Sequence, residues 1–228
     1  MNSGPTKKIA GVIFDLDGTL YDLSGLKWRM ALALWQSIKL LRTLSPVRNV
    51  LRTQTFSDGT ELKQELFLQL ADRASVSTDK AETWYKQDFY PNFVKILKRH
   101  KTARPGAADL LAELKDKGVK LAIVSDFGRV PARTQAIGLN PSLFDELLSS
   151  EDEGSLKPHF EPFVALARKW QLSPDQIVVL GDKEELDGTA ADSCKMKFIG
   201  IAQNDKKTNN SQRILTWPQA VEHLRTNT

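Results

Sequence analysis

Short apolar runs that contain β-branched residues recur in the two end regions of this chain, and most of them stop at a polar residue or a glycine. Runs of this length and composition are typical of buried strands. Between them, apolar residues recur every three or four positions, which indicates amphipathic helices. Strands that alternate with helices predict an α/β fold with a doubly wound parallel sheet and right-handed crossovers. The expected strands are residues 9–14, 119–124, 144–148, 177–180 and 196–201.

The helices of these end regions should connect the strands. Their start and stop signals are proline near the first turn and glycine after the last. The expected helices cover residues 107–117, 131–137, 161–170 and 184–193, and a last helix begins near Pro218. The polar stretch 204–213 is expected to be a loop.

Residues 21–103 have no strand pattern and should be all helical. A proline inside a helix removes a donor and its ring clashes with the preceding turn. We therefore expect Pro46 to end or break the first helix of this segment, and Pro91 to interrupt the last one. Trp28 and Trp35 stand seven residues apart, on a similar helix face. Core packing is the expected use of these rings, and stacking on a substrate is the alternative.

The change of pattern predicts two domains. Residues 1–20 and 104–228 should form the α/β core, and residues 21–103 should form a helical domain inserted after the first strand. The length of 228 residues and a hydrophobic content of 41% are sufficient for such a globular protein.

Composition excludes some classes of protein. One cysteine, Cys194, allows no intrachain disulfide, which favours a reducing, cytoplasmic location. The N-terminal residues lack the apolar region of a signal peptide. No run reaches about 18 apolar residues, so we expect no membrane span.

Positive charge is concentrated in one segment. Residues 21–103 carry 14 Lys and Arg against 8 Asp and Glu, whereas the remainder carries 18 against 20. The favoured interpretation is a solvated basic surface, and the alternative is a lid that attracts an anionic substrate. Binding to nucleic acid is the weakest interpretation, because no recognised nucleic-acid motif accompanies the charge.

Two carboxylates, Asp15 and Asp17, follow the first strand. The carboxyl ends of parallel strands form the edge where open α/β sheets have their active sites. Gly18 permits a turn that can bring both side chains to one site. Adjacent carboxylates repel each other unless a cation or shared proton compensates, and oxygen ligands suit Mg²⁺.

The string Asp15-Leu16-Asp17-Gly18-Thr19-Leu20 resembles the first signature motif of the haloacid dehalogenase-like (HAD) superfamily. The resemblance implies that Asp15 is a nucleophile that forms an aspartyl-phosphate and that Asp17 is the general acid/base. It also implies a Rossmann-like core, for which residues 21–103 look like the helical C1-type cap.

Three later motifs of the same family have counterparts in the same order. Ser125, in Val124-Ser125-Asp126, resembles the residue that hydrogen-bonds a phosphoryl oxygen. Lys157, before Pro158, resembles the lysine that offsets the charge of the nucleophile and the phosphoryl group. Asp182 and Asp187 resemble the GD…D motif. There Asp182 would ligate Mg²⁺, and Asp187 would be a ligand through water or a partner of Lys157.

The resemblance implies a site of three overlapping parts. The catalytic residues would be Asp15, Asp17, Ser125 and Lys157. The substrate-binding residues would be Ser125, Asp126 and Lys157. The metal site would use Asp15, Asp182, Asp187 and the main-chain carbonyl of Asp17.

Two residues depart from the family pattern. Asp126 stands where many members have Asn, and it adds negative charge beside a phosphate site unless it points away. Lys183 stands where a small residue is common and adds positive charge. The three histidines show no metal-ligand spacing and are expected to be structural or exposed.

These residues predict a Mg²⁺-dependent phosphatase that hydrolyses a small phosphorylated metabolite. A phosphomutase acting on a sugar phosphate would share every core residue, and a non-catalytic binding protein with this fold is the alternative from a different class. A dehalogenase is disfavoured, because that chemistry does not need the acid at Asp17. We expect no nucleic-acid or membrane partner, and the sequence leaves the oligomeric state open.

Overall fold

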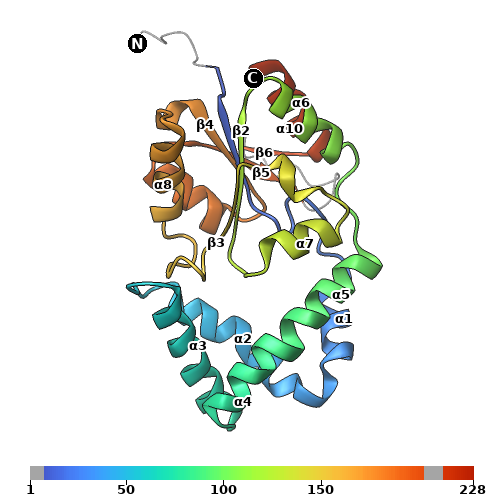
Figure 1. The fold of residues 1–228 in the computed structure, drawn as a ribbon, viewed down its shortest axis with the longest axis vertical. Helices are drawn as coiled ribbons and strands as arrows, with labels where there is room; N and C mark the ends of the chain where they lie inside the picture. The colour runs from blue at the N-terminus through green and yellow to red at the C-terminus, as the bar shows by residue number, and fades with distance from the viewer. Residues whose placement is uncertain (1–7, 203–212) are drawn as a thin grey trace.

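A six-stranded parallel sheet forms one half of the molecule (Figure 1). The computed structural model describes residues 8–202 and 213–228. Within these residues the strand order is β3-β2-β1-β4-β5-β6, so β1 lies in the middle and is buried along its whole length. The strands are β1 Gly11–Phe14, β2 Lys120–Ser125, β3 Glu146–Ser149, β4 Ile177–Gly181, β5 Lys197–Ile201 and β6 Ile214–Leu215.

Helices cover both faces of the sheet, as expected for a doubly wound fold (Figure 1). Alternate residues of β1 point to opposite faces: Val12 and Phe14 pack in one apolar cluster, and Ile13 packs in the other with α8. The helices of this half are α6 Ala107–Asp116, α7 Val130–Ala136, α8 Glu161–Trp170, α9 Thr189–Ser193 and α10 Trp217–Asn227. A π-helical turn, Glu184–Gly188, precedes α9.

The direction of winding reverses at β1. From β1 the chain passes to β2 and β3 on one side, whereas β4, β5 and β6 lie on the other. The crevice between the carboxyl ends of β1 and β4 is therefore the topological switch point, where open α/β sheets bind their ligands.

The segment between β1 and α6 is helical and forms a cap over this edge of the sheet (Figure 1). Its apolar residues belong to the same buried cluster as Leu16, Leu20 and Tyr21, so the cap is packed onto the core. Its helices are α1 Leu26–Ala33, α2 Ile38–Leu51, α3 Gly59–Ala74, α4 Thr78–Thr83 and α5 Tyr90–His100, with a 3₁₀ turn at Trp35–Ser37 and a π-helical stretch at Trp84–Phe89.

The two proline predictions in the cap had different outcomes, and the prediction that Pro46 ends or breaks its helix was wrong. Pro46 lies inside α2, where Pro46 and Arg42 are both exposed. The carbonyl of Arg42 has no helical hydrogen-bond donor, because proline at position 46 lacks a backbone N–H. Water can serve that carbonyl, and buried neighbours on the opposite face stabilise the helix. Pro91 lies in the first turn of α5, directly after the π-helical stretch, so the α-helical pattern is interrupted near Pro91 and resumes to His100, as predicted. The altered hydrogen-bond spacing of the π stretch accommodates the missing donor.

Core packing of the two tryptophans was also a wrong prediction. Trp28 is 55% exposed and Trp35 is 67% exposed. The buried residues of α1 are Leu26 and Met30, and Trp28 stands two positions from each of them, on the opposite side of the helix.

Three smaller outcomes complete the comparison with the sequence. The two-residue strand β6 was not predicted. The predicted loop 204–213 lies outside the described residues except for Arg213. None of the helices within residues 8–202 and 213–228 is long and apolar enough to cross a membrane.

Candidate active site

Asp15 is fixed at the switch point by the strand that precedes it. Its N–H donates to the carbonyl of Leu180 on β4, with N and O 2.8 Å apart, so the pairing of β1 and β4 continues to the acid. The backbone then turns at Gly18, whose φ of 96° is in the left-handed region that favours glycine. The turn brings the Thr19 hydroxyl 3.2 Å from Oδ2 of Asp15, to which it donates.

Lys157 lies between two of the predicted site carboxylates. Its Nζ is 2.6 Å from Oδ1 of Asp15 and 2.6 Å from Oδ1 of Asp187, and it donates to the carbonyl of Val124 at 3.1 Å. The side chain is buried, which alone would lower the pKa of the amine. Asp15 and Asp187 outweigh burial and raise this pKa, so Lys157 stays cationic.

Three acids form a group that fits a divalent cation. Carboxylate oxygens of Asp15, Asp182 and Asp187 all lie within 4.8 Å of one another, and no other such group occurs among the described residues. Burial raises the pKa of Asp15, and Asp187 and Asp182 raise it further, against the effect of Lys157. Burial followed by Asp187 raises the pKa of Asp182 to about 6, and burial raises that of Asp187. Clustered oxygen donors that repel one another suit Mg²⁺.

Asp17 faces a different set of partners. Its carboxylate accepts from Nη1 of Arg133 at 2.7 and 2.6 Å, from the Ser125 hydroxyl at 3.1 Å, and from the hydroxyl of Tyr21. Burial would raise the pKa of Asp17, but the guanidinium of Arg133 and these hydrogen bonds outweigh it and hold the pKa below its ordinary value. The carboxylate of Asp17 is not part of the acidic group formed by Asp15, Asp182 and Asp187. The metal contact predicted for Asp17 was through its main-chain carbonyl and does not need this carboxylate.

Sequence reasoning missed Arg133 and Tyr21. Arg133 lies on α7, eight residues after Ser125, in a segment with no motif that distinguishes it. Its ion pair with Asp17 spans 116 positions, a separation at which local pattern carries no signal. Tyr21 is the residue directly after the first motif, and its position there is the one signal that could have found it.

Asp126 connects the site to the cap. Its Oδ1 accepts from the N–H of Lys157 at 3.0 Å, and its Oδ2 is 2.5 Å from Nη1 of Arg52, the residue directly after α2. Burial would raise the pKa of Asp126, but Lys157, Arg52 and Arg48 lower it. Its two carboxylate oxygens therefore face the N–H of Lys157 and the guanidinium of Arg52, and neighbouring cations balance the negative charge that we expected Asp126 to add.

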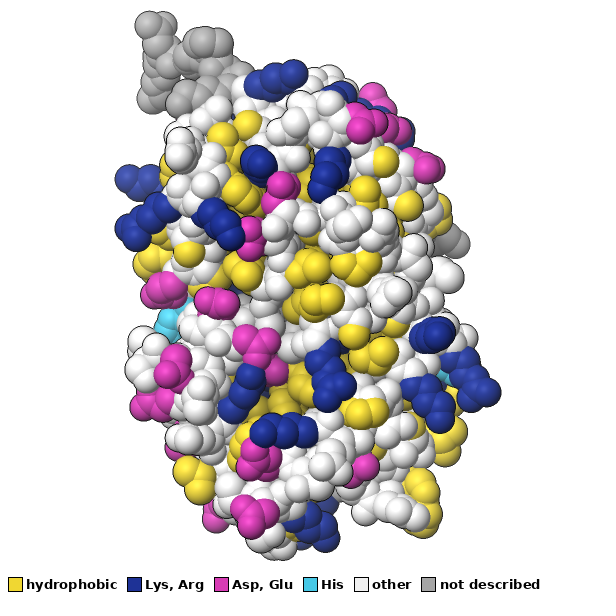
Figure 2. Space-filling model, in the orientation of Figure 1, with side chains coloured by type: hydrophobic (Ala, Val, Ile, Leu, Met, Phe, Trp, Pro, Cys, Tyr) yellow, Lys and Arg dark blue, Asp and Glu magenta, His cyan; other side chains and the backbone are white. Residues whose placement is uncertain are grey.

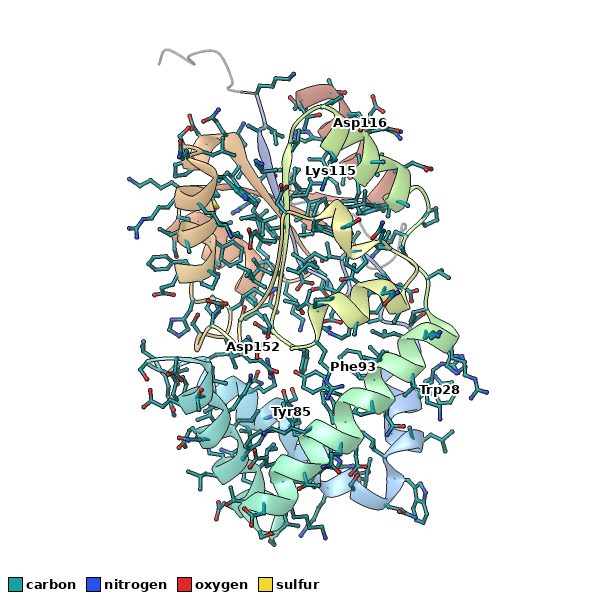
Figure 3. All side chains as sticks on the ribbon, in the orientation of Figure 1. Trp28, Tyr85, Phe93, Lys115, Asp116 and Asp152 are labelled. Atoms are coloured by element: carbon teal, nitrogen blue, oxygen red, sulfur yellow. The ribbon has the colours of Figure 1, made fainter. Side chains whose placement is uncertain are left out.

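A second buried contact between cap and core centres on Glu151, after β3. Its carboxylate lies 2.6 Å from Nη1 of Arg48 and accepts from Tyr85 at 2.7 Å and from Tyr90. Figure 3 places Tyr85 in the cap, and Asp152, next to Glu151, on the core side of this junction. The cap is thus closed onto the core by charged groups that are shielded from water.

The remaining candidates are the three histidines, Cys194 and Lys183. His100 and His223 are exposed, and Nε2 of His159 lies 3.0 Å from the carbonyl of Arg52, so the expectation that histidines are structural or exposed is confirmed. Cys194 is buried, as its interpretation as a small apolar residue predicted. Lys183 is exposed.

Trp28 lines a cavity on the outer edge of the cap. The cavity, about 250 Å³, lies between α1 and α5, and Arg29, Lys95 and Arg99 also line it. Lys and Arg side chains gather at this edge in Figure 2, and Figure 3 shows Trp28 there, away from the junction of cap and core. The position gives no support to stacking of Trp28 on a substrate bound at Asp15.

Comparisons with known proteins agree with this geometry. The family model of haloacid dehalogenase-like hydrolases matches residues 9–194. Phosphoglycolate phosphatase of Shigella dysenteriae serotype 1 is 26% identical over 212 residues, which are 85% of this chain and 81% of that protein. The crystal structure of a predicted phosphoglycolate phosphatase from Haemophilus somnus 129pt superposes with a TM-score of 0.58 at 26% identity and covers 88% of each chain.

A further relative is much longer than this chain. Protein SUPPRESSOR OF QUENCHING 1, chloroplastic, of Arabidopsis thaliana is 27% identical over 213 residues, which are 91% of this chain. The match covers 19% of that protein, so this chain spans about a fifth of its length.

Proposed function

Because this chain belongs to the haloacid dehalogenase-like hydrolase family, we propose that it is a Mg²⁺-dependent phosphatase that hydrolyses a small phosphate monoester through an aspartyl-phosphate on Asp15. The observation that carries the proposal is the position of Lys157. Its ammonium lies 2.6 Å from both Asp15 and Asp187, beside Asp182, at the switch point of the sheet. This arrangement balances charge around a carboxylate that must approach a phosphate.

The residues have separate roles in the proposed reaction. Asp15 attacks phosphorus through a carboxylate oxygen while the bond from phosphorus to the leaving oxygen breaks, and Asp17 donates a proton to that oxygen. Asp17 must first take this proton from solvent, because Arg133 and the hydrogen bonds to its carboxylate lower its pKa and favour the ionised form. Asp17 then takes a proton from the water that hydrolyses the acyl-phosphate. Ser125 would donate to a phosphoryl oxygen, and Lys157 would offset the charge of nucleophile and phosphoryl group.

The acidic group would hold the metal. Asp15, Asp182 and the main-chain carbonyl of Asp17 would be ligands, and Asp187 would act through water or through Lys157. When bound, Mg²⁺ screens the charge between the Asp15 carboxylate and the phosphoryl group. The raised pKa values of Asp15 and Asp182 support this role, because burial raises them, neighbouring carboxylates raise them further, and a bound cation would offset both effects.

The proposed substrate is a small phosphorylated metabolite such as a phosphorylated hydroxy acid or sugar phosphate, with no nucleic acid or membrane partner. The similarity to a phosphoglycolate phosphatase supports this class. We further propose a core of residues 1–20 and 104–228, a cap of residues 21–103, and a cytoplasmic location. A phosphomutase is the second candidate, since it would use the same core residues, and transfer to a sugar phosphate instead of water would identify it.

A screen of phosphate esters tests the proposal. The wild-type protein should release phosphate from at least one ester, including a generic aryl phosphate, with Mg²⁺ and not with chelator. Asp15→Asn should reduce turnover to background, because it removes the nucleophilic charge and keeps the shape. Asp88→Asn, a change of an exposed cap carboxylate, is the matched control and should be fully active. Wild-type activity in a clean Asp15→Asn preparation would refute the covalent mechanism.

A further inference from the structure

Arg133 is a fully buried cation whose five N–H groups all have partners. Its side chain has 0% exposure, and Nε donates to the carbonyl of Gly128 at 3.0 Å. Nη1 donates to both carboxylate oxygens of Asp17. Nη2 donates to the Ser125 hydroxyl at 2.7 Å and to the carbonyl of Phe127 at 2.6 Å. The guanidinium is therefore fixed in position by the loop after β2.

The cap covers the other side of this group. The ring centroid of Phe93, on α5, lies 5.1 Å from Cζ of Arg133, a cation–π distance (Figure 3 labels Phe93 at the junction). A guanidinium buried in this way is costly unless it is paired and hydrogen-bonded. Asp17 is the carboxylate that pairs with it, so each of the two groups restricts the orientation of the other.

The geometry at Asp17 is more restrictive than a single ion pair. One oxygen accepts from Arg133 and Tyr21, and the other accepts from Arg133 and Ser125. Rotation of the carboxylate would break bonds on both oxygens. Arg133 also contacts Ser125 directly, so one side chain fixes two residues that belong to different motifs.

We propose that Arg133 is a positioning residue that holds the Asp17 carboxylate and the Ser125 hydroxyl in their working orientation. The inference rests on the proposed function, in which Asp17 transfers protons and Ser125 contacts the phosphoryl group. It assigns to α7 a role in the reaction that none of the four motifs includes. A misplacement of about 1 Å in such a group can cost about 10²-fold in rate.

A merely structural role for Arg133 is the competing explanation, because its bonds to Phe127 and Gly128 also shape the loop. The two roles differ in their dependence on Asp17. A positioning residue acts through Asp17, so its removal should cost little once Asp17 no longer transfers protons. A structural residue should reduce activity by the same factor in either background.

The test is a double-mutant cycle of Arg133→Lys, Arg133→Met and Asp17→Asn, measured on an aryl and an alkyl phosphate. Arg133→Met should lower kcat by about 10²-fold with a small change in KM. Arg133→Lys keeps the positive charge and should recover part of this loss. The recovery should be incomplete, because an ammonium cannot contact both oxygens of Asp17 as a planar guanidinium does. The loss should be greater for the alkyl ester, which needs protonation of its leaving oxygen. Arg168→Lys, on the exposed face of α8, is the control and should match wild type.

In the Asp17→Asn background, either Arg133 variant should change kcat less than threefold. Equal factors in both backgrounds, or a loss that is the same for both esters, would overturn the inference. Affinity for Mg²⁺, measured by calorimetry in Arg133→Lys, should stay within twofold of wild type, and a large loss would indicate a collapsed site. If Arg133→Met fails to fold, the kcat values of Arg133→Lys in the two backgrounds test the inference alone. If the wild-type chain hydrolyses no ester, the proposed function fails, and a crystal structure of Arg133→Lys still tests positioning through the orientation of Asp17.

Discussion

Removal of one acid from the metal group should stabilise the metal-free protein. Asp15, Asp182 and Asp187 bring three carboxylates within 4.8 Å, and the ammonium of Lys157 contacts Asp15 and Asp187. Asp182 can be neutralised by Asp182→Asn with almost no change of shape. We expect the variant to be more stable than wild type in chelator at pH 7.5, because an amide at this position is free of the burial cost and of the repulsion by Asp187 that raise the pKa of Asp182.

The magnitude follows from the pKa of Asp182. Burial and Asp187 raise it from 3.8 to about 6, whereas the unfolded chain keeps the ordinary value. Below pH 3.8 the group is protonated in both states and contributes fully to stability, and this contribution is lost as the pH rises through 6. The difference corresponds to about 3 kcal/mol at most. Because Asp182 is partly exposed, solvent screens the repulsion, and we expect about 1–2 kcal/mol.

Urea denaturation measures this effect directly. In chelator, Asp182→Asn should raise the free energy of unfolding at pH 7.5, and the gain should disappear near pH 4. With Mg²⁺ the order should reverse, because metal that binds the folded state stabilises wild type and has lost a ligand in the variant. Asp88→Asn controls for loss of one negative charge on the surface. A variant less stable than wild type in chelator, with a neutral control, would refute the reasoning.

Three further changes test other parts of the structure. Arg48→Met leaves Glu151 buried without its cation and should cost about 3–5 kcal/mol in urea denaturation, so a loss below about 1 kcal/mol would contradict the closed junction. Burial raises the pKa of the Cys194 thiol to about 11, so at pH 8 the native protein should react with a thiol reagent far more slowly than the unfolded chain. Equal rates for the native and the unfolded protein would argue against burial of Cys194. If the charge of the cap attracts substrate, reversal of charge at Lys27 and Arg29 should raise KM more than it lowers kcat, and kcat/KM of the wild type should fall as ionic strength rises. Unchanged kinetics in the variant and a salt-independent kcat/KM would show that this charge serves solubility only.

The sheet could be predicted from sequence because buried strands leave unbroken apolar runs. The run before Asp15 and the run before Asp182 mark β1 and β4 within two residues of their observed bounds. Asp15 and Asp182 could be selected as candidates for the same reason, since each is the first acid after such a run. The two-residue β6 leaves too short a pattern, and it pairs with β5 across the undescribed residues 203–212.

The errors in the cap have a different origin. Whether Pro46 ends α2 depends on whether water or protein surrounds the carbonyl of Arg42, and sequence does not record that environment. Likewise, a seven-residue spacing places Trp28 and Trp35 on a similar helix face but does not say whether that face is buried, and in α1 the buried face is that of Leu26 and Met30. Tertiary surroundings decide both cases.

Asp126 shows why a departure from a family motif needs a structure to interpret. Alone, an Asp where many members have Asn adds a negative charge beside a phosphate site. Here its Oδ2 is 2.5 Å from Arg52 of the cap, and Arg52 also donates to the carbonyl of Lys157 at 2.5 Å. An amide could accept the N–H of Lys157, but it could not balance the charge of the partly exposed Arg52 guanidinium. The acid at 126 and the arginine at 52 therefore form one unit across 74 positions, and the added charge is balanced by the cap instead of facing the phosphate alone.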